Sequence, residues 1–160
     1  DPVCEVNGVQ RQYINQYTNH DSAELRGVEL FFNVPLGPVD LKTNYTYSDS
    51  EITESKDSPE SVGQPFNNLP KHMVNVGVDW AATEALGVWA KARYKSSTVE
   101  DSTSQRPSYT LVDVGALYRV SDNFDVYGGL YNLFDKQVTA EDYGKTLDGR
   151  RLNLGIAFNF

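Results

Sequence analysis

Hydrophobic and polar residues alternate with a period of two along most of this chain. In the last ten residues, the even positions are Leu, Leu, Ile, Phe and Phe, whereas the odd positions are Arg, Asn, Gly, Ala and Asn. Successive side chains of a β-strand point to opposite faces, so this pattern predicts a strand with one apolar face. We predict eight strands, of which the first has the weakest pattern: Val9–Tyr17, Val28–Val34, Val39–Tyr47, His72–Trp80, Leu86–Lys95, Tyr109–Val120, Phe124–Leu133 and Arg151–Phe160.

The connections between these strands alternate in length. Tight turns therefore gather at one end of an antiparallel meander, and long polar loops gather at the other. Bacterial outer-membrane barrels have this asymmetry, with short periplasmic turns and long external loops. The predicted turns are Pro35–Pro38, Ala81–Ala85 and Ser121–Asn123, and the predicted loops are Ser48–Lys71, Ser96–Ser108 and Lys136–Gly149.

A soluble sandwich or a lipocalin-like barrel with its apolar face inward also explains the alternation. Three features favour a membrane wall instead. The second face mixes Gly, Asn, Asp, Lys and Arg with single aromatics, unlike a typical solvent face, and the chain ends on a strand at an aromatic residue. Aromatic residues also gather near strand ends, as in the girdles at membrane–water boundaries: Tyr45, Tyr47, Trp80, Tyr94, Tyr109 and Tyr118. We therefore predict an all-β fold, a transmembrane antiparallel up-and-down β-barrel segment.

Composition excludes several classes of protein. The 160 residues fit one domain, and no apolar run approaches the length of a transmembrane helix. A net charge of -8, from 14 basic and 22 acidic residues, argues against nucleic acid as a partner. One cysteine and two histidines far apart in sequence argue against a zinc site. No nucleophile motif or phosphate-binding glycine loop is present, so we expect no enzyme, no metal and no cofactor.

One predicted strand carries positive charge within this acidic chain. Trp89, Lys91, Arg93 and Lys95 alternate along Leu86–Lys95 and share its non-apolar face. We call these four residues the cationic row. Such a row attracts an anionic ligand, partly by steering, which makes the four residues candidates for ligand binding. Alternatively, the cations form a network that stabilises the wall, and both interpretations can hold; the carboxylates available on neighbouring strands are Asp79, Asp113 and Asp125.

Two further groups of charges flank the predicted membrane wall. Five carboxylates between Asp49 and Glu60 provide oxygen atoms for Ca²⁺ or for a divalent cation that bridges lipopolysaccharide. No ligand spacing is defined there, and a solvated loop is the simpler interpretation. Arg150 and Arg151 follow the last long loop, where they meet lipid phosphates at the outer leaflet or pair with nearby carboxylates.

Three short motifs follow one another between residues 17 and 160. They are Tyr17-Thr18-Asn19 with Ala23 and Gly27-Val28-Glu29; Leu69-Pro70-Lys71-His72; and Asn132-Leu133-Phe134-Asp135-Lys136 followed by Gly149-Arg150-Arg151 and a strand that ends in Phe160. In this order and with a terminal aromatic residue, they resemble the barrels of TonB-dependent outer-membrane receptors of the ferric enterobactin and colicin I type.

The resemblance implies that residues 1–160 are the C-terminal part of such a barrel domain, which has 22 strands around a plug. The plug, the TonB box and the remaining strands are then expected outside this chain. The implied function is uptake of an iron complex such as a ferric siderophore, with this chain in the barrel wall and in the ligand-capturing loops. Cys4 then resembles half of an external-loop disulfide, with a free thiol as the alternative, and Phe160 resembles the signal for barrel assembly.

The resemblance also implies a location and a set of partners. The location is the bacterial outer membrane, in contact with lipid and lipopolysaccharide, and coupling to the TonB system runs through the plug. Bacteriocins or phages are further candidate partners of the loops. The alternative is a complete small barrel of eight strands with a structural or adhesive role, whose interior is filled by side chains. A soluble binding protein is the third interpretation.

Overall fold

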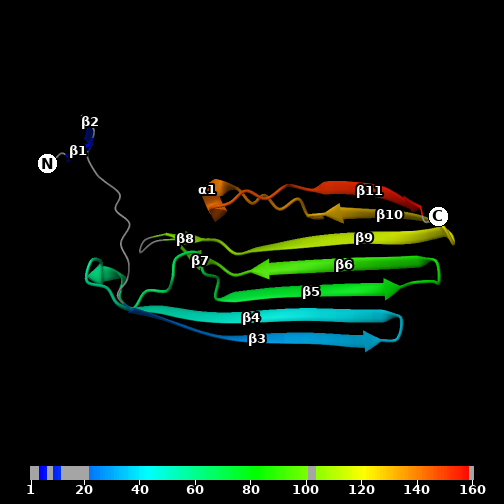
Figure 1. Ribbon diagram of the computed structural model, residues 1–160, viewed down its shortest axis with the longest axis horizontal. Coiled ribbons are helices and arrows are strands. Elements are labelled where there is room, and N and C mark those ends of the chain that lie inside the picture. Colours follow the sequence, from blue (N-terminus) through cyan, green and yellow to red (C-terminus); the bar gives the residue numbers. More distant parts are fainter. Residues whose placement is uncertain (1–3, 7–8, 12–21, 101–103, 159–160) are drawn as a thin grey trace.

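The computed structural model describes residues 4–6, 9–11, 22–100 and 104–158. Its main feature is one seven-stranded antiparallel sheet (Figure 1). Each strand of the sheet pairs with the strand that follows it in the meander, so the up-and-down topology predicted from the sequence is confirmed. The strands are β3 (Ser22–Leu36), β4 (Val39–Glu54), β5 (His72–Ala81), β6 (Leu86–Lys95), β9 (Tyr109–Ser121), β10 (Phe124–Tyr131) and β11 (Arg151–Phe158).

Short elements accompany the sheet. The predicted strand Val9–Tyr17 is wrong as a member of the sheet, because its described part, β2, pairs with β1 in a separate hairpin. The rest of that segment lies outside the described residues. Among the described helices, none has the length and apolar content needed to cross a membrane. The short elements are β1 (Cys4–Val6), β2 (Val9–Arg11), η1 (Pro59–Ser61), β7 (Thr98–Val99), β8 (Gln105–Arg106) and α1 (Ala140–Tyr143).

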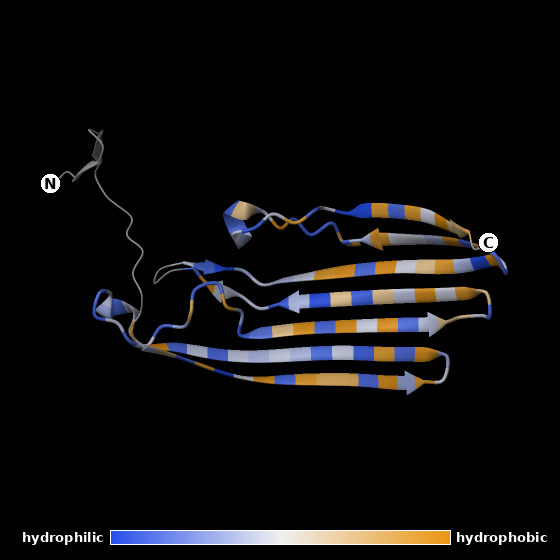
Figure 2. Cartoon of the chain, viewed as in Figure 1, coloured by the Kyte–Doolittle hydropathy of each residue, from blue (hydrophilic) through white to orange (hydrophobic). Residues whose placement is uncertain are grey.

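Hydrophobic and hydrophilic residues alternate along the strands of the sheet (Figure 2). Because successive side chains point to opposite sides, the sheet has two chemically distinct faces. The register keeps each face continuous: Val76 lies opposite both Thr43 and Ala92, whereas Asn75 lies opposite both Asn44 and Arg93. We call these the apolar face and the polar face. On the apolar face Leu154 is 77% exposed, as expected of a lipid-facing wall. A soluble sandwich would bury that side chain, because apolar surface is driven out of water.

Aromatic side chains border the apolar face at both ends of the strands. Near the short turns, the rings of Phe124 and Phe158 stack with their centroids 4.6 Å apart. Five of the six aromatic residues predicted to form girdles share this face by register, so they flank the apolar band at two levels. They are Trp80 and Tyr118 near the turns, and Tyr45, Tyr47 and Tyr94 near the loops.

Tyr109 is the sixth, and the girdle prediction is wrong for it. It lies opposite Lys95 on the polar face. Its ring meets that of Tyr143 edge-on, with the centroids 5.4 Å apart, and the ammonium group of Lys145 lies 5.3 Å from its centroid. Tyr109 therefore anchors the last long loop rather than the membrane boundary, which the strand pattern alone did not indicate.

The β3–β4 hairpin is longer than predicted. β4 continues seven residues beyond Tyr47, through residues 48–54, and β3 begins at Ser22 instead of Val28. The backbone of Ile52 is also paired with the following loop, since its N–H donates to Gln64 O at 3.0 Å and its carbonyl accepts from Gly63 N at 2.8 Å. Both faces of this extension carry polar residues, so hydrophobic alternation could not predict it.

The sheet has two outer edges. Within the described residues, β3 pairs only with β4, and β11 pairs only with β10. A complete small barrel would pair its first and last strands, because an open edge leaves backbone groups unpaired in lipid. The arrangement therefore does not favour the alternative of an independent eight-stranded barrel.

Candidate functional site

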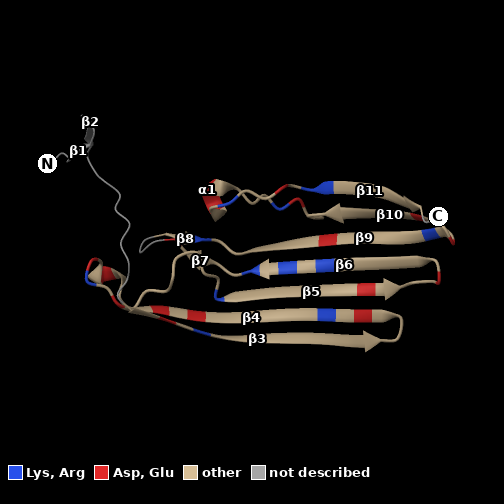
Figure 3. Cartoon of the chain, in the orientation of Figure 1, with Lys and Arg blue, Asp and Glu red and all other residues tan. Residues whose placement is uncertain are grey.

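The register places the cationic row on the polar face of β6, as the alternation predicts, and Figure 3 shows the basic residues along that strand. β6 runs from a short turn toward the long loops, so Trp89 lies nearer the turns and Lys95 nearer the loops. Lys91 is opposite Gly77 on β5 and opposite Asp113 on β9. Three cations therefore follow one line along the centre of the sheet.

The predicted network with neighbouring carboxylates forms for one of these three cations. Arg93 pairs with Asp113, with 3.0 Å between Nη2 and Oδ2. Lys91 instead lies over the ring of Trp89, with Nζ 5.3 Å from the ring centroid. Within the described part of the chain, neither Lys91 nor Lys95 has a carboxylate partner. Two members of the row thus keep a positive charge that no described anion neutralises.

The other two carboxylates named from the sequence pair elsewhere. Asp79 accepts a hydrogen bond from Lys42 Nζ at 2.8 Å. Asp125 lies 3.9 Å from Arg119 Nε, near the short turns. These two contacts join neighbouring strands as a wall network does, but through cations outside the cationic row.

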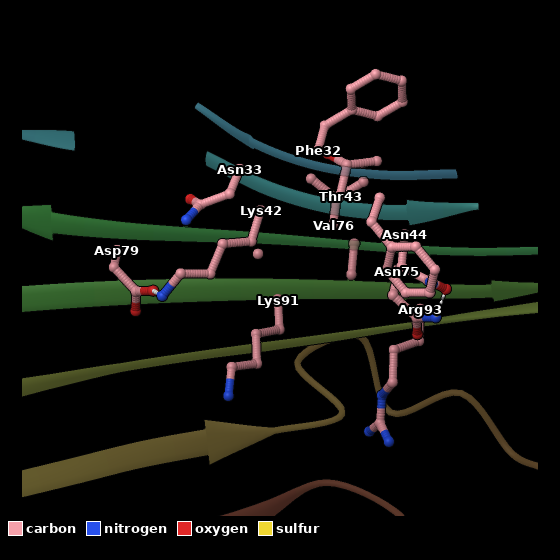
Figure 4. A pocket seen from close by; sticks show the side chains of 13 residues that line it. Phe32, Asn33, Lys42, Thr43, Asn44, Asn75, Val76, Asp79, Lys91 and Arg93 are labelled. Carbon is pink, nitrogen blue, oxygen red and sulfur yellow. Dashed lines mark hydrogen bonds and ion pairs between the residues drawn. The ribbon is translucent and has the colours of Figure 1, made fainter. Parts of the chain in front are cut away.

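A hollow of about 810 Å³ opens on the polar face beside β6 (Figure 4). Gly77 lies between Lys42 and Lys91 in the register, and the missing side chain leaves room between the two cations. Lys91 and Arg93 line this hollow, whereas Trp89 and Lys95 do not. The other polar lining residues come from β3, β4 and β5, and only Asp79 among them was named from the sequence, as a possible ion-pair partner. They are Asn33, Lys42, Thr43, Asn44, Asn75 and Asp79.

The hollow combines positive charge with amide groups. Asn75 Nδ2 donates a hydrogen bond to Asn44 Oδ1 at 3.3 Å, which orients both amides across neighbouring strands. A guanidinium and two ammonium groups beside these amides suit an anionic, oxygen-rich ligand, because charge-assisted hydrogen bonds are the stronger ones. In the described ranges, no three His, Cys, Asp or Glu residues come close enough to hold a metal ion.

Trp89 lies across the neighbouring strand at a glycine. A Cβ built on Gly115 would come within 2.5 Å of Trp89 Cε2 and within 2.6 Å of the carbonyl oxygen of Gly128. The ring also reaches Gly129, and it lies 5.9 Å from the ring of Tyr131 between centroids. The mid-strand glycines of β10 thus mark a close approach between neighbouring strands. Trp89 packs the wall as well as supporting Lys91.

Charged side chains continue on the loop side of the girdle. Lys71 Nζ lies 3.0 Å from Asp49 Oδ1 and 5.6 Å from the ring centroid of Tyr47. The hydrogen bond to the Asp49 carboxylate raises the pKa of the Lys71 ammonium group. Asp49 and Glu51 are strand residues of β4, so this part of the predicted acidic loop belongs to the hairpin. Arg151 pairs with Asp148 at 2.9 Å, as one interpretation of the sequence expected.

Two residues singled out in the sequence remain untested. Phe160 lies outside the described residues. Cys4 belongs to β1, but its side chain is not among those described. The assembly signal at Phe160 and the disulfide or free thiol at Cys4 therefore stay predictions.

Comparison with known proteins places the chain in a family. Residues 1–133 match the family model described as TonB dependent receptor-like, beta-barrel. An iron-regulated outer membrane virulence protein of Vibrio cholerae is 34% identical over 149 residues, which are 89% of this chain and 22% of that protein. The ferric enterobactin receptor PirA of Pseudomonas aeruginosa is 31% identical over 137 residues, or 78% of this chain and 18% of that protein. The chain thus spans about a fifth of the length of the curated relatives it matches.

Solved structures agree with this assignment. The siderophore receptor PiuA from Acinetobacter baumannii matches with a TM-score of 0.76 and 28% identity, covering 85% of this chain and 22% of that one. The ferric preacinetobactin receptor BauA from the same species matches with a TM-score of 0.73 and 25% identity, covering 86% of this chain and 22% of that one. The resemblance seen in the sequence motifs is confirmed, and this chain belongs to the TonB-dependent receptor-like β-barrel family of the bacterial outer membrane.

Proposed function

We propose that the receptor to which this chain belongs takes up an anionic iron complex of the siderophore class across the outer membrane. The chain forms part of the barrel wall and of the external loops that capture the ligand, and TonB supplies energy through a plug outside this chain. The names of its relatives support the iron complex, because they include ferric enterobactin and ferric preacinetobactin receptors. No catalysis is proposed.

The observation that carries this proposal is the positive hollow in an acidic chain. The net charge of the chain is -8, yet Lys91 and Arg93 line one hollow together with Lys42. Positive charge that faces a water-filled lumen raises the local concentration of an anionic ligand and speeds its arrival. The Trp89 ring contacts the Lys91 ammonium group at the turn end of the row, and Lys95 extends the row toward the loops. We therefore assign ligand contact to Trp89, Lys91, Arg93 and Lys95.

The test uses the intact receptor and ferric enterobactin as the anionic probe. The double variant Lys91→Gln/Lys95→Gln removes the two cations that lack a described carboxylate partner, so no buried anion is left behind. An exposed charge contributes about 0.2–1 kcal/mol, so the loss of two such charges, about 1 kcal/mol together, should weaken binding about fivefold at low salt. The loss should shrink as salt rises toward 1 M, where the Debye length falls to about 3 Å.

Lys71→Gln is the matched control, because it removes a similar positive charge on the loop side of the girdle. It should leave probe affinity within about twofold of the wild type. Equal losses in the control and in the double variant would show a non-specific effect of net charge. An unchanged affinity in the double variant at every salt concentration would remove the cationic row from the ligand site.

The remaining proposed partners are surface components. Outer-membrane lipid contacts the apolar face, and lipopolysaccharide meets the charged band that includes Lys71 and Asp49. Bacteriocins and phages are candidate binding partners of the long loops. Vesicles with and without lipopolysaccharide test the second contact, since Lys71→Gln should change receptor stability only where lipopolysaccharide is present.

A further inference from the structure

Asp113 is a buried carboxylate at the centre of the polar face. Its side chain is 7% exposed, and both of its oxygens are used. Oδ2 lies 3.0 Å from Arg93 Nη2, and Oδ1 accepts the backbone N–H of Asn132 at 2.8 Å. One carboxylate thus touches both the cationic row and the first residue after β10.

Asn132 closes the neck of the last long loop. Its Nδ2 group donates to Lys136 O at 3.0 Å and to Asp148 O at 3.2 Å, and its Oδ1 atom accepts from Lys136 N at 2.8 Å. The two ends of the loop are therefore tied through the side chain of one buried residue, which is 5% exposed. The neck is also held by Asp135, whose Oδ1 atom accepts Arg150 N at 2.8 Å.

The body of this loop has separate anchors. Thr139 caps α1 by accepting Asp142 N at 3.3 Å, and Tyr143 is buried against Tyr109. A change at the neck can therefore alter how the loop is seated without unfolding the helix turn in it. Movement of the loop as a unit is the expected consequence.

Arg93 contacts the other oxygen of the Asp113 carboxylate, the one that does not bind the Asn132 amide. Its side chain is 56% exposed and lines the polar-face hollow. A guanidinium has five N–H donors, and one nitrogen is directed to Asp113, so the other donors stay available to a ligand in the hollow. An exposed arginine would otherwise sample several rotamers, and the fixed carboxylate reduces that freedom.

We propose that Asp113 is the positioning residue of this site, which fixes the Arg93 guanidinium and the neck of the last loop through a single carboxylate. The idea deepens the proposed function, since it rests on Arg93 contacting the ligand, but its first test needs no ligand. A buried carboxylate that loses its cation is drawn toward water, because its desolvation is no longer compensated. Oδ1 then leaves the amide of Asn132, and the loop neck loosens.

The test measures hydrogen exchange of the neck amides, those of Asn132, Lys136 and Arg150, in the intact receptor in lipid discs. Arg93→Gln should speed their exchange about tenfold, the effect of losing one charged hydrogen bond. Adding Asp113→Asn should restore protection, because a neutral amide needs no cation and its oxygen still accepts from Asn132. The matched control is Arg119→Gln, a polar-face cation on the same strand as Asp113, which should leave the loop unchanged.

Rescue of Arg93→Gln by Asp113→Asn supports the proposal, because residues that act separately would give additive losses. A double variant at least as loose as Arg93→Gln overturns it. If Arg93→Gln lowers the amount of receptor assembled, the same rescue is read from assembled yield. Ferric enterobactin binding to the double variant tests the proposed function separately, since the loop is then intact while the cation is missing.

Discussion

Gly115 offers a direct test of how the wall beneath the cationic row is packed. An added Cβ would be within 2.5 Å of Trp89 Cε2 and within 2.6 Å of Gly128 O, closer than real Cβ atoms come to such neighbours. The indole ring and the backbone of β10 would both have to move. Overpacking of this kind costs about 1–3 kcal/mol, whereas alanine in place of glycine regains about 0.4–1 kcal/mol from the unfolded chain. We therefore predict that Gly115→Ala destabilises the receptor by about 1–2 kcal/mol.

Gly87→Ala is the matched control, since it also lies within a sheet strand, and a Cβ there would meet nothing within 4 Å. It should be neutral or slightly stabilising. Urea unfolding of both variants in lipid vesicles gives the comparison. The dependence of the unfolding free energy on urea concentration, the m-value, must be equal for the midpoints to report stability. Equal midpoints for the two variants would refute the packing argument. In the Trp89→Val background, Gly115→Ala should cost less stability than in the wild type, but it should still cost some, because the clash with the Gly128 carbonyl remains.

Three further outcomes are expected. Spin labels at Ile156 should be quenched by a lipid-soluble agent while labels at Asn153 should not, and reversed accessibility would contradict the assignment of the two faces. Deleting Phe160 should lower the amount of receptor that reaches the outer membrane, and an unchanged yield would remove it as an assembly signal. Glycine in place of Asn132 tolerates the positive φ of 51°, but the three side-chain hydrogen bonds are lost. Proteolysis of the last loop should therefore become severalfold faster in Asn132→Gly, and an unchanged cleavage rate would contradict the role of Asn132 in closing the loop neck.

The sheet could be predicted from the sequence because lipid and lumen impose different chemistry on alternate residues. Seven strands follow from that contrast, and so does the shared face of Lys91 and Arg93. The contrast fades beyond the membrane, which is why the extension of β4 to Glu54 and the turn of α1 at Ala140 were not foreseen. Capping by Thr139 is a local signal for that turn, but a four-residue helix leaves no periodicity to detect.

The hollow could not be predicted, because it depends on register between strands. Lys42 and Lys91 are far apart in sequence, and they flank Gly77 only when β4, β5 and β6 pair as they do. Likewise, the sequence offered Asp113 as one of three possible partners of the row. The pairing of β6 with β9 brings Asp113 beside the row, opposite Lys91, and the Arg93 side chain reaches it diagonally.

The β3–β4 hairpin has a consequence for how the cell surface is recognised. Seven strand residues beyond Tyr47, at about 3.3 Å each, extend the hairpin by about 20 Å past the girdle. Its backbone is held by cross-strand hydrogen bonds, so an antibody or a phage fibre would meet a fixed shape there. Glu51 and Glu24 face each other across this hairpin and are exposed, so substitutions at them change its surface chemistry while the backbone pairing persists. The receptor can therefore vary its epitopes at this height without altering the wall that crosses the membrane.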